Sequence, residues 1–319
     1  MNNFSPIHQI EHPLFHQYKL QVYIKRDDLL HPIISGNKWR KLKYNLKAAI
    51  NENKNSILSF GGSYSNHIHA LAFACYQQGL GSVGIIRGEQ EYAHNFTLSW
   101  ARHWGMKLEF VDRKTYRKRQ QNQYIKELQQ KFPQSFIVPE GGSNTLALSG
   151  VGDICSELQQ QGITYDHLLL PVGSGGTLAG LIDSDKNQHN LLGIAVLKQG
   201  NSCANYLSTE VNKLLPQRAK HFSNWQILNN YHRGGYAKFS ALDLERLREF
   251  ISITNIPFEP VYSGKMILAL LDLITQGYFQ AYDKIMLLHT GGLQGLGGLA
   301  ERKLINPLEW PLPPMPTAK

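Results

Sequence analysis

Cysteine is scarce in this chain of 319 residues, which contains only Cys75, Cys155 and Cys203. The three are far apart, their number is odd, and no C-x-x-C pair occurs. These features argue against a disulfide framework and against a zinc site. They are typical of a reducing compartment, so we expect a cytoplasmic protein.

Long apolar runs are absent as well. The most apolar segment, "MILALLDLI" at residues 266–274, is too short to span a bilayer and carries Asp272. The first residues, "MNNFSPIHQIEHPLFHQ", have no apolar core of the kind a signal peptide needs. We therefore expect no association with membranes.

Acidic residues are outnumbered, with 24 Asp and Glu against 33 Lys and Arg. A basic balance favours anionic partners. The densest basic run begins at Arg113 and has helical spacing, without the aromatic and glycine pattern of an RNA-binding strand or the spacing of a zinc finger. We interpret it as a solvated helix face and expect no nucleic-acid partner.

The chain does contain a regular alternation of β-rich apolar runs with segments of helical periodicity, which predicts an α/β fold with open, mostly parallel sheets flanked by helices. A chain of this length is expected to form two lobes. The predicted strands are residues 22–25, 57–60, 82–86, 107–111, 136–138, 167–172, 192–197, 225–228 and 285–288.

Three of the predicted strand-to-helix turns are rich in glycine: "GGSYSNH" at residues 61–67, "GSGGT" at 173–177 and "TGGLQG" at 290–295. Glycine lets the backbone approach a ligand closely, and the helix that follows presents its positive end. Ligands of parallel sheets bind beyond the carboxyl ends of the strands. We expect anions to bind at these turns.

The spacing of the glycines excludes the common nucleotide folds. No G-x-x-x-x-G-K-[ST] motif occurs, and only nineteen residues follow the G-x-G-x-x-A match that ends at Ala300, too few for a dinucleotide fold. In "GSGGTLAG", Leu178 stands where the third glycine of the dinucleotide pattern would be. This turn is better suited to a single phosphate, with Thr177 at the start of the helix.

Lys38 lies at another turn, in "SGNKWRKL". A lysine at a turn, a cup for one phosphate, and Ser-Asn at a helix start are the groups that pyridoxal 5′-phosphate needs: an amine for a Schiff base, N–H donors for the phosphate, and a donor for the ring oxygen. We interpret Lys41, Lys43 and Lys47, farther along the same basic helix, as surface lysines.

These motifs resemble the pyridoxal-phosphate enzymes of the tryptophan-synthase β fold (fold type II), specifically the family of D-cysteine desulfhydrase and 1-aminocyclopropane-1-carboxylate (ACC) deaminase. The resemblance covers nearly the whole chain and follows the family's order: "IKRDDL", "SGNKWRKL", "SFGGSYSNHIHALA", "PEGGSN", "PVGSGGTLAGL", "EPVYSGKM" and "LLHTGGLQGL". It implies a large cofactor-binding lobe of residues 1–43 and 150–319, a smaller inserted α/β lobe of residues 44–149, chemistry in the cleft, and a homodimer.

The resemblance also implies roles for individual residues. Lys38 forms the Schiff base with the cofactor, Asn66 donates to the ring oxygen, and Ser65 is an active-site serine. Ser65, Asn66 and His67 start a helix whose N–H groups hold the substrate carboxylate. Helix capping by Ser65 and Asn66 remains compatible with those roles. His67 and His69 point to different faces of a helix, so we expect no metal there.

The remaining implied roles concern the phosphate, the substrate and the pyridine ring. Tyr262 matches the family's active-site tyrosine, in catalysis or substrate binding, although a structural tyrosine is the alternative. Thr290 places a hydroxyl against the pyridine nitrogen. The phosphate is held by Gly173, Ser174, Gly175, Gly176 and Thr177.

The activity that the resemblance implies is elimination from a small D-amino acid, D-cysteine first, which gives pyruvate, sulfide and ammonia. In the ACC deaminases a glutamate follows the tyrosine and leucine replaces the threonine, whereas this chain has Ser263 and Thr290. Neutral hydroxyls support a protonated pyridine nitrogen less well than a carboxylate does, which favours elimination. ACC deaminase activity, and a binding protein without turnover, remain alternatives.

Overall fold

The computed structural model describes residues 4–34, 36–198 and 205–314. The chain divides into two compact units. The first unit comprises Met1–Asn37 and Val151–Gly292, and the second comprises Lys38–Gly150 and Leu293–Lys319. The division predicted from the sequence put the C-terminal residues in the larger lobe, whereas residues 293–319 belong to the second unit.

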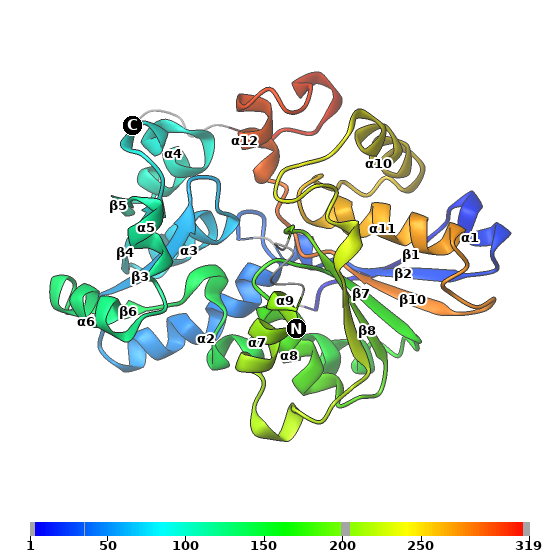
Figure 1. The fold of residues 1–319 in the computed structure, drawn as a ribbon, viewed down its shortest axis with the longest axis horizontal. Coiled ribbons are helices and arrows are strands. Elements are labelled where there is room, and N and C mark those ends of the chain that lie inside the picture. Colours follow the sequence, from blue (N-terminus) through cyan, green and yellow to red (C-terminus); the bar gives the residue numbers. More distant parts are fainter. Residues whose placement is uncertain (1–3, 35, 199–204, 315–319) are drawn as a thin grey trace. The chain divides into compact units, whose positions relative to one another are not determined.

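The first unit is built on one six-stranded sheet (Figure 1). Its order is β1 (Ile7–Ile10), β2 (Gln21–Lys25), β10 (Lys284–Leu288), β7 (His167–Val172), β8 (Asn190–Ala195) and β9 (Trp225–Leu228). β1 pairs with β2 in the antiparallel direction, and every other pair in this sheet is parallel. Consecutive apolar residues fill β7, as expected for a strand that is covered on both faces.

Helices cover both faces of this sheet. α11 lies along β7 and β8, and α8 packs against the same two strands from the other side (Figure 1). The helices of the first unit are α1 (Pro13–Gln17), α8 (Gly176–Asp185), α9 (Tyr206–Leu214), α10 (Ala241–Thr254) and α11 (Ser263–Thr275), and α7 (Thr145–Gln160) crosses the boundary between the units.

The apolar run at residues 266–274 lies inside α11 and is almost completely buried there. A helix that is apolar on all sides is expected in the core of a large unit. Over the described ranges of the chain, no helix is both long and apolar enough to cross a membrane.

The core of the first unit also contains a buried ion pair. Lys25, at the end of β2, is completely buried, and its Nζ lies 2.7 Å from a carboxylate oxygen of Glu157 on α7. The same amine donates to the carbonyl oxygen of Ser5 at 2.8 Å and to Oε1 of Gln161 at 2.7 Å. Because a buried ammonium is tolerated only with such partners, these bonds fix α7 and the N-terminal segment relative to β2.

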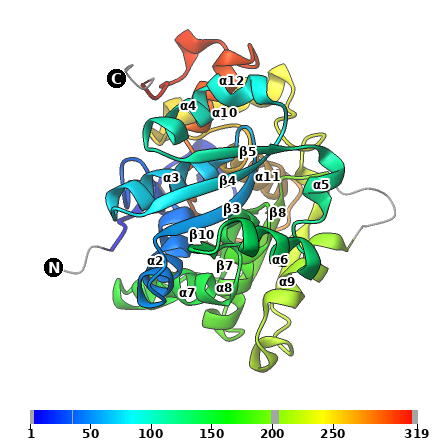
Figure 2. The same cartoon turned by 90° about the vertical axis from the view of Figure 1, so that its left-hand side faces the viewer.

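The second unit contains a four-stranded parallel sheet in the order β5 (Lys107–Val111), β4 (Gly81–Arg87), β3 (Ser56–Gly62) and β6 (Ser135–Ile137). Figure 2 shows β5, β4 and β3 side by side. The helices of this unit are α2 (Asn37–Asn51), which begins at the last residue of the first unit, α3 (Asn66–Gln77), α4 (Phe96–His103), α5 (Arg113–Arg117), α6 (Asn122–Lys131) and α12 (Gly295–Glu301). Short 3₁₀ turns are η1 (Asp27–Leu29), η2 (Gln90–His94), η3 (Glu140–Gly142), η5 (Gln217–Ala219), η6 (Asn229–Tyr231) and η7 (Pro307–Glu309).

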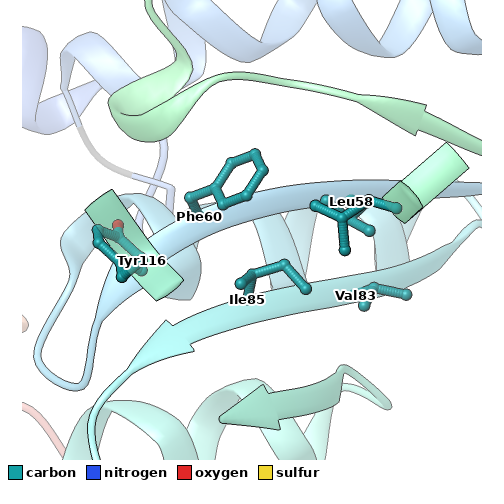
Figure 3. Close-up of a cluster of buried hydrophobic side chains, with 6 residues drawn as sticks. Leu58, Phe60, Val83, Ile85 and Tyr116 are labelled. Atoms are coloured by element: carbon teal, nitrogen blue, oxygen red, sulfur yellow. The ribbon is translucent and has the colours of Figure 1, made fainter. Parts of the chain in front are cut away.

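One face of the second sheet packs against α5 and α6. Side chains from β3 and β4 meet Tyr116 of α5 and Leu128 of α6 in a buried cluster (Figure 3). The cluster consists of Leu58, Phe60, Val83, Ile85, Tyr116 and Leu128. The basic residues Arg113, Lys114 and Arg117 are exposed, which confirms that this run is a solvated helix face.

The C-terminal residues pack with the second unit because two glycines of α12 leave room for aromatic rings. A Cβ atom on Gly297 would lie 2.5 Å from the ring of Phe96, and one on Gly298 would lie 2.6 Å from that of Tyr64. A carboxylate oxygen of Glu301 also accepts the N–H of Phe96 at 3.1 Å. These contacts, and not nucleotide binding, account for the G-x-G-x-x-A match.

The strands predicted from the sequence are confirmed, although the ends of six of them, β2, β3, β4, β6, β8 and β10, differ by one or two residues from the prediction. The α/β class and the mostly parallel sheets are confirmed too. β1 was not predicted, because only Ile10 of its four residues is buried and the segment therefore has no apolar pattern.

Candidate functional site

Three neighbouring strands of the first unit end at one edge of its sheet. β2, β10 and β7 are adjacent and parallel, so their carboxyl ends coincide. The segment after β2 contains Gly36 and Asn37, the segment after β10 contains Thr290, and the turn 173–177 follows β7. The fold thus brings together segments that the sequence indicated separately.

The turn before Lys38 is held against both of the other segments. Gly36 has φ +71°, and a Cβ atom on it would lie 1.8 Å from the carbonyl oxygen of Thr290, so only glycine fits. The N–H of Asn37 donates to the same carbonyl oxygen at 3.3 Å. Nδ2 of Asn37 donates to Oγ1 of Thr177 at 2.9 Å. Sequence reasoning gave Asn37 no role, although its place in the G-N-K motif was a signal.

The turn 173–177 has the geometry of an anion cradle. Gly175, the N-cap of α8, has φ +80°, and a Cβ atom there would lie 2.8 Å from the side chain of Val211. The first N–H groups of a helix have no partner inside the helix. The hydroxyl of Thr177 accepts from Asn37, so it can use its own hydrogen toward an anion. This arrangement agrees with the predicted phosphate site.

Tyr262 lies beside the same turn. It is the N-cap of α11, and a Cβ atom on Gly173 would lie 3.2 Å from its Cε1. The ring of Tyr236 meets that of Tyr262 edge-on, with centroids 6.0 Å apart. The first unit therefore brings Tyr262 and the predicted phosphate turn together.

A buried histidine orients the turn that contains Thr290. Nε2 of His289 lies 2.7 Å from the carbonyl oxygen of Pro257, so this nitrogen carries the hydrogen. Nδ1 then accepts the N–H of Gly291 at 3.2 Å. Burial lowers the pKa of His289, which keeps the ring neutral and preserves this arrangement.

In the second unit, Lys38 lies in the first turn of α2 and is half-buried. Loss of hydration lowers the pKa of Lys38 to about 8. Near neutral pH, a larger fraction of this amine is neutral and nucleophilic than in an ordinary lysine.

Lys41 is not the surface lysine that the sequence suggested. Only 2% of it is exposed, and its Nζ donates to the carbonyl oxygen of Gly141 at 3.2 Å and to Oγ of Ser143 at 2.9 Å. Lys41 follows Lys38 by three residues, so the two side chains lie on the same face of α2. This spacing was the signal in the sequence that Lys41 belongs near Lys38 and not on the surface. Lys43 and Lys47 are exposed, as predicted.

Ser65 and Asn66 begin α3. Oγ of Ser65 accepts the N–H of Ile68 at 3.3 Å, so the capping role that the sequence allowed is present. The side-chain oxygen of Asn66 lies 3.5 Å from where a Cβ atom of Gly295 would be. Capping leaves the other N–H groups of the first turn for a carboxylate.

His67 is buried behind this first turn, with 2% of its surface exposed. Its Nε2 lies 2.7 Å from Oγ of Ser59, whose hydroxyl donates to the carbonyl oxygen of Val138 at 2.8 Å. Nε2 therefore carries the hydrogen. Burial and the charges of Lys38 and Lys41 hold the pKa of His67 well below its usual range, so the ring is neutral.

His69, the other histidine of this helix, packs edge-on against Trp104 with ring centroids 4.9 Å apart. Within residues 4–34, 36–198 and 205–314, no group of three or more His, Cys, Asp or Glu side chains is arranged to hold a metal ion. Cys203 lies outside the described residues, and within the described part of the chain neither Cys75 nor Cys155 forms a disulfide.

The family model described as "Pyridoxal-phosphate dependent enzyme" matches residues 5–291. A putative 1-aminocyclopropane-1-carboxylate deaminase of Pyrococcus furiosus is 30% identical over 290 residues, which cover 86% of this chain and 85% of that protein. A D-cysteine desulfhydrase of Klebsiella pneumoniae is 26% identical over 86% of this chain and 88% of its own length. A crystal structure of an "ACC deaminase homologue" aligns with a TM-score of 0.78 and 27% identity, covering 94% of this chain and 93% of that one.

We predict that Gly36→Ala will lower the free energy of unfolding by more than ~2 kcal/mol, because the methyl group meets the carbonyl oxygen of Thr290 and the left-handed backbone is unfavourable as well. Gly79→Ala is the matched control: Gly79 has φ +66° but no atom lies within 4 Å of the added carbon, so we expect a loss of about 1 kcal/mol. Chemical denaturation measures both. Equal losses would contradict the close approach at Gly36.

Proposed function

The chain belongs to the family of pyridoxal-phosphate-dependent enzymes, and on that premise we propose that it catalyses α,β-elimination on a small D-amino acid, with D-cysteine as the first candidate. Its cofactor is pyridoxal 5′-phosphate, and its substrate is a small molecule. From D-cysteine the products would be pyruvate, sulfide and ammonia. The relative from Klebsiella pneumoniae that is named for this activity supports the choice.

One observation carries the choice of elimination: the residue after Tyr262 is Ser263, a neutral hydroxyl. Ser263 is completely buried, and its Oγ donates to a carboxylate oxygen of Glu259 at 3.0 Å. Thr290, the residue that the resemblance assigns to the pyridine nitrogen, is neutral too. A neutral partner does not keep that nitrogen protonated, so the reaction that needs less electron withdrawal is favoured.

The residues of the chain fit the cofactor. The turn 173–177 can hold one phosphate through N–H groups and the hydroxyl of Thr177, and a side chain on Gly173 or Gly175 would occupy space that Tyr262 or Val211 fills. Lys38 supplies an amine with a lowered pKa. The peptide bond from Asn37 to Lys38 joins the residues of the first unit to those of the second. We propose that both groups act on the same cofactor molecule.

Bound pyridoxal phosphate supplies an electron-withdrawing ring at the α-carbon of an attached amino acid. We assign the attachment of the cofactor, and removal of the proton from the substrate α-carbon, to Nζ of Lys38. Because the pKa of Lys38 is about 8, the amine can act as a base near neutral pH. Asn66 would donate its amide N–H to the ring oxygen.

Two further groups would act on the substrate. The N–H groups of Asn66 and His67, at the start of α3, would bind its carboxylate, aided by the positive end of the helix dipole. The N–H of Ser65 donates to the carbonyl oxygen of Gly62 at 3.0 Å. Oη of Tyr262 would orient the substrate or transfer a proton to the leaving sulfur. Ser65 would contribute its hydroxyl beside the carboxylate.

ACC deaminase activity is the second candidate. It is favoured by the relative from Pyrococcus furiosus, whose name states that activity as putative. Opening a cyclopropane ring needs strong electron withdrawal, whereas expelling a thiol from the β-carbon needs less. The neutral Ser263 and Thr290 therefore favour D-cysteine over ACC.

A homodimer and a cytoplasmic location remain proposals. The homodimer rests on the family resemblance. The location rests on the small, odd number of cysteines, which are far apart and form no C-x-x-C pair. Sedimentation of the purified protein would test the first proposal.

We predict that Lys38→Ala will lower turnover by about 10²- to 10⁴-fold or more, because the chain loses both the attachment point and the base. Lys43→Ala, an exposed lysine of the same helix, should leave turnover unchanged. Borohydride treatment of the native protein should attach the cofactor to the peptide that contains Lys38. Attachment at another lysine would overturn the assignment.

On a single preparation, we expect D-cysteine to release pyruvate and sulfide faster than ACC releases 2-oxobutanoate and ammonia. Three further compounds complete the panel. L-Cysteine tests which stereoisomer the protein prefers, and D-serine and β-chloro-D-alanine test which leaving group it prefers. The measurement is the ratio of kcat/KM values. Equal or faster turnover of ACC would mean that the partner of the pyridine nitrogen does not control the reaction.

A further inference from the structure

α11 begins with an unusual residue for a helix start. Its N-cap is Tyr262, which has no short polar side chain with which to bind the first N–H groups and makes no side-chain capping bond. Glu259 supplies the cap instead. Its carboxylate accepts the N–H groups of Val261 at 2.7 Å, Tyr262 at 2.9 Å and Ser263 at 2.7 Å.

The backbone of Glu259 takes part in the same turn. Its carbonyl oxygen accepts the N–H of Gly264 at 2.8 Å. A Cβ atom on Gly264 would lie 2.7 Å from that oxygen and 2.5 Å from the side chain of Leu247. The first turn of α11 is therefore wrapped closely around Glu259, and glycine is needed for the approach.

Glu259 is 1% exposed, so its carboxylate depends on these donors in place of water. Burial raises the pKa of Glu259 to about 7, while the N–H groups and the hydroxyl of Ser263 act in the opposite direction. Lys265 is buried nearby and donates to the carbonyl oxygens of Val196 at 3.1 Å and Gly235 at 2.5 Å. The sequence gave no sign of this cap, because a glutamate before proline has the pattern of a surface residue.

The position of Tyr262 follows from this cap. The N–H of Tyr262 lies within 2.9 Å and 3.1 Å of the two carboxylate oxygens, so the backbone of the tyrosine is fixed by Glu259. Its ring then lies beside Gly173 of the phosphate turn. The cap also commits the hydroxyl hydrogen of Ser263 to the carboxylate, which leaves Thr290 as the hydroxyl that can donate to the pyridine nitrogen.

We propose that Glu259 is a positioning residue, whose carboxylate sets the first turn of α11 so that Tyr262 would be placed for its role toward the substrate and the hydroxyl hydrogen of Ser263 is taken up by the carboxylate. The proposal rests on the role of Tyr262 in the proposed function. Glu259 itself is surrounded by its donors and does not act on the substrate.

The test uses the holoenzyme and the variants Glu259→Gln, Tyr262→Phe and the double variant. Glu259→Gln keeps the size of the side chain but turns an NH₂ group toward N–H donors. We expect it to retain the cofactor and to lower kcat by about 100-fold, the scale of an ångström-sized misplacement. The double variant should be no slower than the slower single variant, because both changes remove the same function. Additive losses of kcat would overturn the proposal.

The matched control is Asp243→Asn. Asp243 is the carboxylate of the capping box at Ser240, in α10 of the same unit, and is 8% exposed. Loss of this cap should lower stability and leave kcat unchanged. If Asp243→Asn and Glu259→Gln lower kcat alike, the effect is general destabilisation and the proposal fails.

A second readout does not depend on turnover. The protein is labelled with 3-fluorotyrosine and its fluorine NMR spectrum is recorded. The resonance of Tyr262 is assigned as the one that is missing from the spectrum of the Tyr262→Phe variant. It should shift in Glu259→Gln and stay in place in Asp243→Asn. An unchanged resonance in Glu259→Gln would overturn the positioning role. A shifted resonance without any effect of Tyr262→Phe on kcat would instead contradict the proposed role of the tyrosine.

Discussion

A side-chain hydrogen bond from Nδ2 of Asn37 to Oγ1 of Thr177 connects the segment before Lys38 to the turn that we assign to the phosphate. The N–H of Asn37 binds the carbonyl oxygen of Thr290, and Gly36 approaches that oxygen too closely for any side chain. Lys38 is the next residue of the chain. These contacts fix the backbone of Gly36 and Asn37, the residue at which α2 begins.

Each unit contains a buried, neutral histidine near residues that we assign to the cofactor or the substrate. His67 and His289 are buried imidazoles whose protonation is set by a hydroxyl and by a carbonyl oxygen, and whose pKa values are lowered. The buried carboxylate of Glu259 is occupied by N–H and O–H donors. Neutral imidazoles in each unit are compatible with the proposed elimination, in which the departing group removes the developing charge.

The sequence predicted the elements whose signals are local. The strands and the turn 173–177 depend on residues adjacent in the chain, and both are present. Contacts between distant residues were missed: the partners of Lys41 lie about one hundred positions away, and Thr177 is 140 positions from Asn37. The family resemblance assigned the C-terminal residues to the larger lobe. The contacts of Gly297 and Glu301 with Phe96, about two hundred positions away, cannot be read from a periodic pattern.

The most direct test of the account is a double-mutant cycle between Asn37→Ala and Thr177→Val, read as the affinity for pyridoxal 5′-phosphate. If the amide of Asn37 orients the hydroxyl of Thr177 toward the phosphate, removing either group removes the same interaction. The account predicts a coupling of about 0.5–3 kcal/mol, as for residues in direct contact. Losses that add within about 0.3 kcal/mol would show that Asn37 and Thr177 act independently, and would contradict it.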